Sequence, residues 1–416
     1  MEELIGRIQA KTLVSYLKKF PVVSVVGARQ TGKSTLVKDL LRMNRKYLTL
    51  DDTTNILLAE QDPESFLRQD LPITIDEVQK VPGLFPAMKK IVDNKRTPGQ
   101  FLITGSANIT MLPKISETLA GRIVFIEMHP ITIMEALRGD LAHPAIGHIM
   151  RAKTAKQCWD TLNSIKPPDF SIEKYIVRGG LPPAYLEKNN EARQAWFKGY
   201  VRTYLERDVR DLSRIQKLYE YQKYLSLLAF RSAQIFNKAE VARDCGIPYT
   251  TAGHFFDLLL ATFQVFLVEP YFRNIGKRLI KSPKIMWSDT GLAMHLQGLN
   301  SWEDAVRLGR DAFFVENKIA IELKSYLSIY EPSAKLFFWR SSGGAEIDFL
   351  IERGEQLIPV EVKWRSAVSL KDATGMQVFL RDFRNEAHWG IVLYKGRQLL
   401  KIKENIFLVP YEYFFA

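Results

Sequence analysis

Residues 22–40 read VVSVVGARQTGKSTLVKDL, and this stretch decides the fold class. A run of mostly β-branched residues ends at a glycine, and from Ser34 onward the apolar positions recur at helical spacing. Between these two segments, GARQTGKS matches G-x-x-x-x-G-K-[ST] at every fixed position. A strand, a glycine-rich loop and a helix in this order predict a phosphate-binding loop in an α/β domain.

The glycines and the lysine of this loop are the residue types that a polyphosphate needs. Glycines let main-chain N–H groups curl around phosphate oxygens at the start of a helix. Lys33 brings a positive charge to the β- and γ-phosphates, and the Ser34 hydroxyl is a ligand for Mg²⁺. The alternative is a glycine turn unrelated to phosphate, which the flanking strand and helix disfavour. ATP and Mg²⁺ are therefore the predicted cofactors, and the predicted nucleotide-binding residues are Gly27, Ala28, Arg29, Gln30, Thr31, Gly32, Lys33, Ser34 and Thr35.

An apolar strand that ends in two acids, ITIDEV (residues 73–78), supplies the second half of such a site. We expect Asp76 to hold Mg²⁺ through water and Glu77 to polarise the attacking water. The alternative is a solvated sheet edge. A water-activating glutamate favours hydrolysis over transfer of a phosphoryl group to a small molecule. Together with Lys33, these two acids form the predicted catalytic set.

A third segment, FLITGSAN (residues 101–108), places polar residues after another strand of buried type. Thr104, Ser106 and Asn108 are candidates to read the γ-phosphate, and the sequence leaves the choice among them open. We include Ser106 with the cofactor-binding residues. Polar residues after a strand also form ordinary turns, which is the alternative reading of this segment.

The ordered set of motifs resembles the ATPase domain of a widespread bacterial and archaeal AAA+ group. The set also includes LDD (50–52), LAGRIVFIEMHPIT (119–132), RGGLPPAYL (178–186), YLERDV (204–209) and the segment 277–293. In that group, a C-terminal region of unknown function follows the ATPase domain. The resemblance implies a homo-oligomer in which a neighbouring subunit supplies an arginine to the γ-phosphate. Arg122 is the first candidate for this catalytic arginine and Arg207 the second, and either fits an intrachain ion pair equally well.

The pattern of elements predicts an α/β protein of several parts. Short strands alternate with helices up to about residue 128, which favours a parallel sheet with helices on both faces. We expect a P-loop AAA+ core over 1–140, a helical lid over 141–228, a winged helix over 229–298 and a restriction-endonuclease-like α/β domain over 299–416.

The predicted winged helix is a candidate DNA-binding module. Its second helix (Tyr249 to Leu260) carries Tyr249, Thr250, Thr251 and His254, which can reach a partner. A basic stripe follows it, and a packing wedge between domains is the alternative role for this module. The residues predicted to contact DNA phosphates are Arg273, Lys277, Arg278, Lys281 and Lys284.

The segment EIDFLIERGEQLIPVEVK (346–363) places charges in two strands of buried type. Because side chains alternate across a strand, Glu346 and Asp348 share one face, and so do Glu361 and Lys363. If the strands pair as a hairpin, these polar sets converge, and burying unpaired carboxylates is costly.

The pattern resembles the restriction-endonuclease-like fold, in which an acid on one strand and E-x-K on the next surround a metal. The resemblance implies that Glu316, Asp348 and Glu361 bind Mg²⁺, with Lys363 and Glu346 beside them. The usual proline before the acid is missing here. An ordinary salt-bridged hairpin is one alternative, and a domain that binds DNA without cutting it is another.

Charge and cysteine content narrow the class of protein. The formal net charge of +12 favours a polyanionic partner such as DNA. The only two cysteines, Cys158 and Cys245, are far apart, which disfavours a disulfide framework and fits a reducing cytoplasm. No apolar run approaches the length of a membrane span, so no membrane partner is expected. The leading hypothesis is ATP-driven DNA processing, perhaps of branched DNA. The alternative is a nucleotide-dependent switch or scaffold whose nuclease-like domain is inactive and binds protein.

Overall fold

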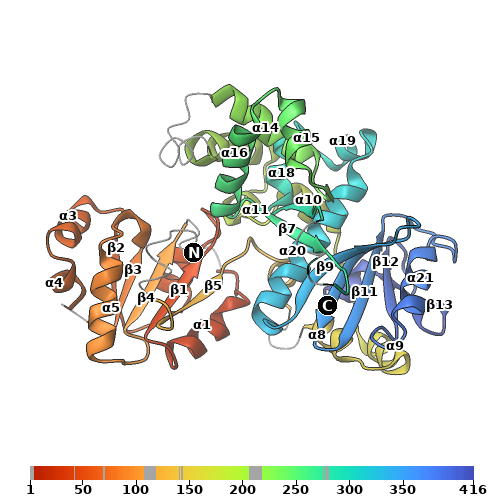
Figure 1. Ribbon diagram of the computed structural model, residues 1–416, viewed down its shortest axis with the longest axis horizontal. Helices are drawn as coiled ribbons and strands as arrows, with labels where there is room; N and C mark the ends of the chain where they lie inside the picture. The colour runs from red at the N-terminus through yellow and green to blue at the C-terminus, as the bar shows by residue number, and fades with distance from the viewer. Residues whose placement is uncertain are drawn as a thin grey trace. The chain divides into compact units, whose positions relative to one another are not determined.

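The computed structural model divides into two compact units (Figure 1). The residues that it describes are 4–41, 43–68, 71–106, 119–139, 141, 144–205, 218–274, 276 and 281–416. The N-terminal unit comprises Met1–Ile131, Leu181–Pro183 and Phe256–Gln264. The C-terminal unit comprises Thr132–Gly180, Ala184–Phe255 and Val265–Ala416. No described helix combines the length and the apolar character that crossing a membrane requires.

A five-stranded sheet in the order β2-β3-β4-β1-β5 forms the centre of the N-terminal unit. Every neighbouring pair in it is parallel, so the parallel sheet predicted from the sequence is confirmed. Its strands are β1 (Val22–Val26), β2 (Lys46–Thr49), β3 (Ile73–Asp76), β4 (Phe101–Gly105) and β5 (Ile123–Glu127). Because all strands are parallel, their carboxyl ends meet at one edge, and the polar residues that follow β1, β3 and β4 gather there.

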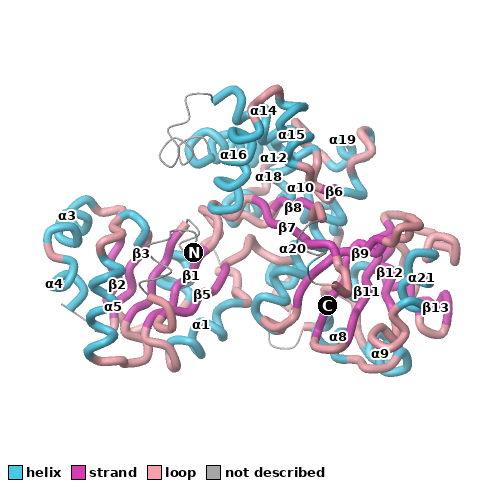
Figure 2. Tube along the Cα trace, in the orientation of Figure 1, coloured by secondary structure: helices cyan, strands magenta, loops and turns pink. Residues whose placement is uncertain are grey.

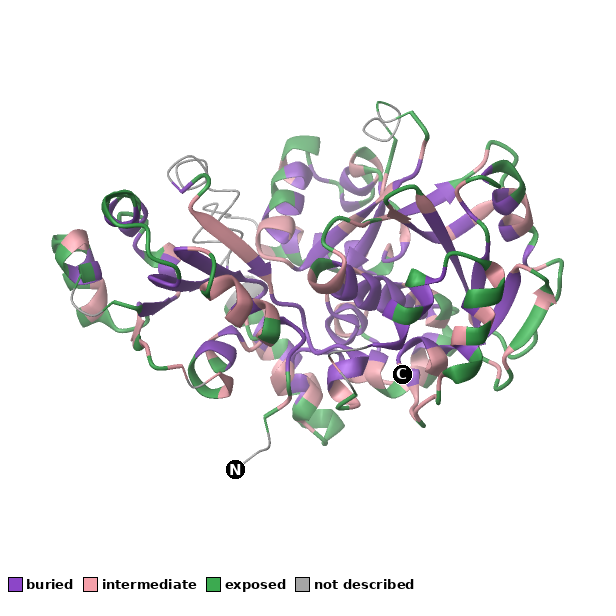
Figure 3. Cartoon of the chain, turned by 90° about the horizontal axis from the view of Figure 1, so that it is seen from below, coloured by how far each residue is buried: buried purple, intermediate pink, exposed green. Residues whose placement is uncertain are grey.

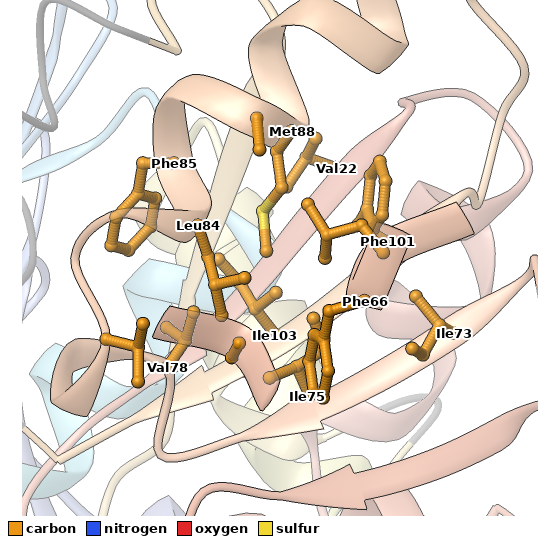
Figure 4. Close-up of a cluster of buried hydrophobic side chains, with 14 of the residues drawn as sticks. Val22, Phe66, Ile73, Ile75, Val78, Leu84, Phe85, Met88, Phe101 and Ile103 are labelled. Atoms are coloured by element: carbon orange, nitrogen blue, oxygen red, sulfur yellow. The ribbon is translucent and has the colours of Figure 1, made fainter. Parts of the chain in front are cut away.

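Helices cover this sheet, which explains why the residues of its central strands are buried and mostly apolar. All five residues of β1 and of β4 are buried. The side chains of Phe66, Leu84 and Met88 pack with those of the strands in one apolar cluster (Figure 4). The helical segments of this unit are α1 (Gln9–Leu17), α2 (Lys33–Thr35), η1 (Leu36–Leu40), α3 (Thr53–Gln61), α4 (Pro63–Arg68), η2 (Val78–Lys80) and α5 (Leu84–Asn94).

The C-terminal unit begins with helices and continues into a second sheet. Its first helices are α7 (Ile133–Ala136), α8 (Ala145–Arg151), α9 (Ala155–Ser164), α10 (Ile172–Arg178), α11 (Pro182–Leu186), α12 (Asn190–Tyr200), η4 (Val201–Leu205) and α14 (Leu218–Phe230). The elements that follow are β6 (Gln234–Ile235), α15 (Lys238–Cys245), α16 (Tyr249–Ala261), β7 (Val265–Pro270), β8 (Lys284–Trp287), α18 (Thr290–Leu296), α19 (Trp302–Arg307) and α20 (Asp311–Tyr330). Two of these helices are divided between the units, because the start of α11 and the end of α16 belong to the N-terminal unit. Helix α15 ends at Gly246, whose φ of 68° is the left-handed conformation that glycine adopts readily.

The second sheet has nine strands in the order β13-β14-β12-β11-β10-β9-β7-β8-β6. Figure 2 shows β11 and β12 side by side, and Figure 3 shows the strands of both units as mostly buried. The remaining elements are β9 (Lys335–Arg340), β10 (Glu346–Arg353), β11 (Gln356–Lys363), α21 (Thr374–Asp382), β12 (Gly390–Tyr394), β13 (Leu400–Lys403), β14 (Ile406–Pro410) and α22 (Tyr411–Phe414).

Strands β10 and β11 form the hairpin that the charge pattern suggested. They pair antiparallel from Phe349 opposite Val360 to Arg353 opposite Gln356. The turn is short, and Gly354 takes a φ of 60°, which favours glycine. One step beyond the first pair, the same register brings Asp348 beside Glu361, so the two charged faces converge.

A buried asparagine joins helix α20 to strand β8. The Asn317 side-chain oxygen accepts hydrogen bonds from the Trp287 N–H at 2.8 Å and from the Ser232 hydroxyl at 2.7 Å. Its amide donates to the Trp287 carbonyl at 2.9 Å. These bonds set the position of α20, and therefore of the neighbouring Glu316, against β8.

We predict that Asn317→Leu destabilises the C-terminal unit by about 3 kcal/mol, because two buried main-chain groups lose their partner while side-chain volume is kept. Urea unfolding monitored by tryptophan fluorescence measures the change. Asn163→Leu, at an exposed asparagine of α9, is the matched control and should change stability little. Equal effects of the two substitutions would contradict this account.

Candidate functional site

The phosphate-binding loop follows β1 and leads into α2, as its sequence predicts. Gly27 has a φ of 150°, and a Cβ atom there would lie 2.3 Å from the main-chain oxygen of Met128. Gly32 has a φ of 92° and precedes the helix directly. Both positions therefore require glycine, because one approaches neighbouring backbone closely and the other has a left-handed conformation.

The ammonium group of Lys33 lies inside this loop. It donates to the main-chain oxygens of Gly27 at 3.0 Å and Ala28 at 2.8 Å. Burial lowers the pKa of Lys33 to about 8, against the opposing attraction of Glu77 and Asp76. Two neutral carbonyls are weak partners for a buried ammonium, so phosphate oxygens would be better ones.

Asp76, at the end of β3, accepts hydrogen bonds from three hydroxyl groups. Its Oδ2 accepts from Ser34 at 2.8 Å and from Tyr47 at 2.7 Å, and its Oδ1 accepts from Thr104. Tyr47 comes from β2 and Thr104 from β4, so the strands on either side of β3 both fix this carboxylate. The sequence pairs Ser34 with Asp76 as the Mg²⁺ site, and the structure brings them together.

Glu77 has a backbone conformation that is unusual for glutamate. Its φ is 57°, in the left-handed region, which costs about 1–2 kcal/mol for a residue with a side chain. Its N–H donates to the Thr104 hydroxyl at 3.2 Å, and its Oε2 accepts from the Ser106 hydroxyl at 3.1 Å and from Gln79. The two acids are thereby held by β4, with Thr104 contacting both.

The residues present fit ATP and Mg²⁺. The loop is a glycine cradle with a buried ammonium, and a serine hydroxyl lies against a buried carboxylate. Ser34 and Asp76 would hold the Mg²⁺, which is commonly bound by one or two protein groups, substrate phosphates and water. When bound, Mg²⁺ would neutralise charge on the phosphate oxygens.

The arginine predicted to reach a neighbouring subunit has a partner in its own chain. Nε and Nη2 of Arg122 contact the two oxygens of Asp93 at 2.5 and 3.0 Å. This is the intrachain ion pair that the sequence left open, so its role at a γ-phosphate stays a prediction. Arg207 and Asn108 lie outside the described residues.

Sequence reasoning missed three residues that hold this site. Tyr47 contacts Asp76, and Gln79 contacts Glu77. The available signal for Tyr47 was its place on β2, which runs parallel to β3, and the signal for Gln79 was its closeness to Asp76 in the chain. Arg7 donates to the main-chain oxygens of Thr31 at 2.7 Å and His129 at 2.5 Å, which links the loop to the segment after β5. Nothing in the sequence connects Arg7 to the loop, which lies more than twenty positions away.

A second cluster of charged side chains lies on the C-terminal sheet. The predicted acids Glu316, Glu346 and Asp348 surround the ammonium of Lys284, with Nζ–oxygen distances of 2.9, 2.7 and 3.5 Å. Beside them, Lys363 Nζ lies 2.6 Å from Glu361 Oε1. The other oxygen of Asp348 accepts from the Val362 N–H at 2.8 Å. The structure therefore gathers all five predicted nuclease-like residues and adds Lys284.

Burial and like charge act on two of these acids. Burial, more than the neighbouring Asp348, raises the pKa of Glu316 to about 7 and that of Glu361 to about 8. The Oε2 atom of Glu361 is buried and has no hydrogen-bond partner among the residues that the structure describes.

These residues do not fit the Mg²⁺ that the fold resemblance implies, because an ammonium stands among the acids that would bind it. Among the residues that the structure describes, no set of three or more Asp, Glu, His and Cys side chains is arranged to hold a metal ion.

The predicted DNA-contacting stripe is described only in part. Lys277 and Arg278 lie outside the described residues, and Lys281 is exposed. Arg273 pairs with Glu386 at 3.1 Å. Lys284 is buried with its ammonium on carboxylates, because strand β8 carries it into the sheet. A buried ammonium in this position is not part of an exposed phosphate-binding stripe.

Family models match three parts of the chain. An AAA domain matches residues 19–137, which contain the whole loop and both acids of the site. A domain of unknown function (DUF8612) matches residues 169–303, and another (DUF4143) matches residues 312–414. The N-terminal unit is therefore an AAA-type P-loop ATPase domain, as its motifs and the site geometry indicate.

Solved structures show weaker likeness. The Walker-type ATPase PABY2304 of Pyrococcus abyssi is 13% identical, with a TM-score of 0.42 over 70% of this chain and 94% of that chain. PH0952 from Pyrococcus horikoshii, a signal transduction ATPase with numerous domains and a tetratricopeptide repeat sensor, is 13% identical. Its TM-score is 0.24 over 80% of this chain and 49% of that chain. Scores of this size do not establish a shared fold over the whole chain.

Two curated proteins match almost the whole chain. They are the uncharacterized proteins Mb2031c of Mycobacterium bovis and Rv2008c of Mycobacterium tuberculosis. Each is 30% identical over 406 residues, which is 97% of this chain and 83% of theirs. The present chain, an ATPase of the AAA type by its N-terminal unit, belongs to the same family as these two mycobacterial proteins.

Proposed function

We propose that this protein hydrolyses ATP with Glu77 as the residue that orients the attacking water, and that it uses hydrolysis to process DNA, including branched DNA. The observation that carries the catalytic part is the geometry of Glu77, whose left-handed backbone and carboxylate are contacted by Thr104 of β4 and by Ser106, which directly follows that strand. A strained acid beside a phosphate-binding loop is typical of a residue kept in place for chemistry.

The residues of the phosphate-binding loop and of the ends of β3 and β4 have different roles in ATP hydrolysis. Lys33 exchanges its two carbonyl partners for phosphate oxygens and stabilises the charge that develops on them. Ser34 and Asp76 hold the Mg²⁺, and Tyr47 and Thr104 keep the carboxylate of Asp76 from turning. Ser106 and Gln79 hold the carboxylate of Glu77, which accepts a proton from the water as it attacks.

The order of elements around α16 supports a winged helix as the DNA-binding part. Helices α15 and α16 are followed by β7 and β8, which pair antiparallel, and β6 pairs with β8. On α16, Tyr249, Thr250 and His254 are exposed, whereas Phe255 is buried against Tyr221 and Tyr224. The face with the exposed residues is available to a partner such as a DNA groove.

The C-terminal elements support a restriction-endonuclease-like domain that binds DNA. Helix α20, the antiparallel strands β9, β10 and β11, helix α21 and strand β12 follow one another, with β12 parallel to β11. The ion pairs around Lys284 favour binding over metal-dependent cleavage. They equally suit the second candidate function, a nucleotide-dependent switch that binds protein, and a homo-oligomer is compatible with both.

The first prediction for the proposed function concerns Glu77. We expect Glu77→Gln to bind ATP normally and to lower ATP turnover about 10²- to 10⁴-fold, because the amide accepts no proton from water. Phosphate release and binding of a fluorescent ATP analogue measure the two effects. Glu60→Gln, at an exposed glutamate of α3, is the control. Near-normal turnover in Glu77→Gln would remove Glu77 from the mechanism.

The second prediction concerns Thr104, whose buried hydroxyl contacts both acids. Thr104→Val should lower kcat about tenfold or more while changing the KM for ATP little, since it loosens Asp76 and Glu77 together. Thr104→Ser keeps the hydroxyl and should restore most of the rate. A Ser variant as slow as the Val variant would mean that packing, and not the hydroxyl, matters at this position.

The third prediction concerns DNA. We expect single-stranded, duplex or four-way DNA to raise ATP turnover several-fold, with binding that weakens steeply between about 50 and about 200 mM salt. The Glu77→Gln protein should hold ATP and DNA together.

Lys281→Ala combined with Lys277→Ala and Arg278→Ala should weaken DNA binding, whereas Lys153→Ala, at an exposed lysine before α9, should not. ATP turnover indifferent to all DNA forms, without salt-sensitive binding, would reject the DNA function and favour the switch.

A further inference from the structure

The acidic cluster on the C-terminal sheet already contains a cation. Lys284, the first residue of β8, extends its side chain past the ring of Phe338, whose centroid lies 5.3 Å from Nζ. Its ammonium then lies against Glu316 of α20 and against Glu346 and Asp348 of β10. An ammonium has three N–H donors, and three carboxylates from two elements surround it.

This cation is more enclosed than the acids that bind it. The side chain of Lys284 is 5% exposed, those of Glu316 and Asp348 are 15% and 13% exposed, and that of Glu346 is 34% exposed. Burial alone lowers the pKa of Lys284, but the three acids outweigh burial and raise it above its ordinary value. The group is therefore a permanent positive charge, and its partners depend on it for neutralisation.

A divalent ion and this ammonium exclude each other. Mg²⁺ requires oxygen ligands at about 2.0–2.1 Å, and Ca²⁺ requires them at about 2.3–2.6 Å, so either ion would occupy the place of Nζ. An ion next to Nζ would meet a neighbouring positive charge with little water to screen it. The other acid of the hairpin, Glu361, already pairs with Lys363, and only its Oε2 lacks a partner.

We infer that Lys284 acts as the built-in cation of this site, so that the natural protein binds no divalent metal there, and that removing the ammonium opens a divalent-metal site made of Glu316, Glu346 and Asp348. The inference rests on the ion pairs of the C-terminal unit and does not depend on ATP hydrolysis or on DNA binding. The charge of Lys284 holds α20, β8 and β10 together, so a fold that resembles a nuclease is kept without a metal.

Two substitutions of Lys284 separate charge from space. Lys284→Ala removes the ammonium and leaves room for an ion, whereas Lys284→Met removes the charge but fills nearly the same volume. Both leave three carboxylates without their cation. Only the alanine variant has space in which a metal can replace it.

The experiment titrates Mn²⁺ into the nucleotide-free full chain and counts bound ions by electron paramagnetic resonance. In the wild-type protein and in Lys284→Met, adding Asp348→Asn should leave the number of bound Mn²⁺ ions unchanged. Lys284→Ala should bind one additional Mn²⁺ per chain, which neither the wild-type protein nor Lys284→Met should bind. Adding Asp348→Asn to Lys284→Ala should remove that ion. The melting temperature of Lys284→Ala, low in chelator, should rise with Mn²⁺.

Two results would overturn the inference. One is an Mn²⁺ ion in the wild-type protein that disappears on Asp348→Asn, and the other is a folded Lys284→Ala protein that gains no ion. If Lys284→Ala folds only when Mn²⁺ is present, the inference holds. If it never folds, the wild-type and Asp348→Asn titrations decide alone. ATP turnover measured on the same samples keeps a failure of this inference distinct from a failure of the proposed ATPase mechanism.

Discussion

An ammonium group taken out of water must be matched by oxygen atoms, and both sites of this protein are organised around that requirement. Lys33 is matched by two main-chain carbonyls, which are neutral. Lys284 is matched by three carboxylates, which are charged. A neutral partner leaves the ammonium ready for an incoming anion, whereas an ammonium already surrounded by three carboxylates attracts no further anion. The first arrangement suits a binding site and the second suits a closed one.

The ATP site depends on the pairing of three parallel strands. Tyr47, Asp76 and Thr104 come from β2, β3 and β4, which adjoin one another in the sheet. Because the register of these strands is fixed, the hydroxyl groups reach the same carboxylate from both sides. The unusual backbone of Glu77 follows from this arrangement, since its N–H and its carboxylate are both held by groups at the end of β4. The catalytic acids are therefore positioned by the sheet and not by a loop alone.

Much of the N-terminal unit could be predicted from the sequence because its signals are local. The strand at 22–26, the loop and the two acids after β3 are each contiguous segments whose context identifies them. The hairpin acids were also predictable, since alternation along two adjacent strands depends only on spacing. Gly27 and Gly32 were expected because both are fixed positions of the contiguous phosphate-loop motif.

The parts that could not be predicted depend on contacts between distant segments. Lys284 is the last residue of the basic segment NIGKRLIKSPK, and its neighbours in the sequence suggest an exposed basic stripe. Pairing of β8 with β7 instead places it in the sheet, and α20 and β10 bring the acids to it. Likewise, the sequence offered Thr104, Ser106 and Asn108 as equals for the γ-phosphate. Only the register of β4 against β3 shows that Thr104 and Ser106 hold the two acids.

Lys33 carries an ammonium that can exchange its partners, whereas the ammonium of Lys284 is permanently paired. The most direct measurement is a crystal structure of the Glu77→Gln protein grown with ATP and Mn²⁺, with the manganese located by anomalous scattering. The predicted result is manganese beside Ser34 and Asp76, Lys33 Nζ on phosphate oxygens, and no manganese among Glu316, Glu346 and Asp348. Manganese in that acidic cluster, or Lys33 still bonded to the carbonyls of Gly27 and Ala28 with ATP bound elsewhere, would contradict it.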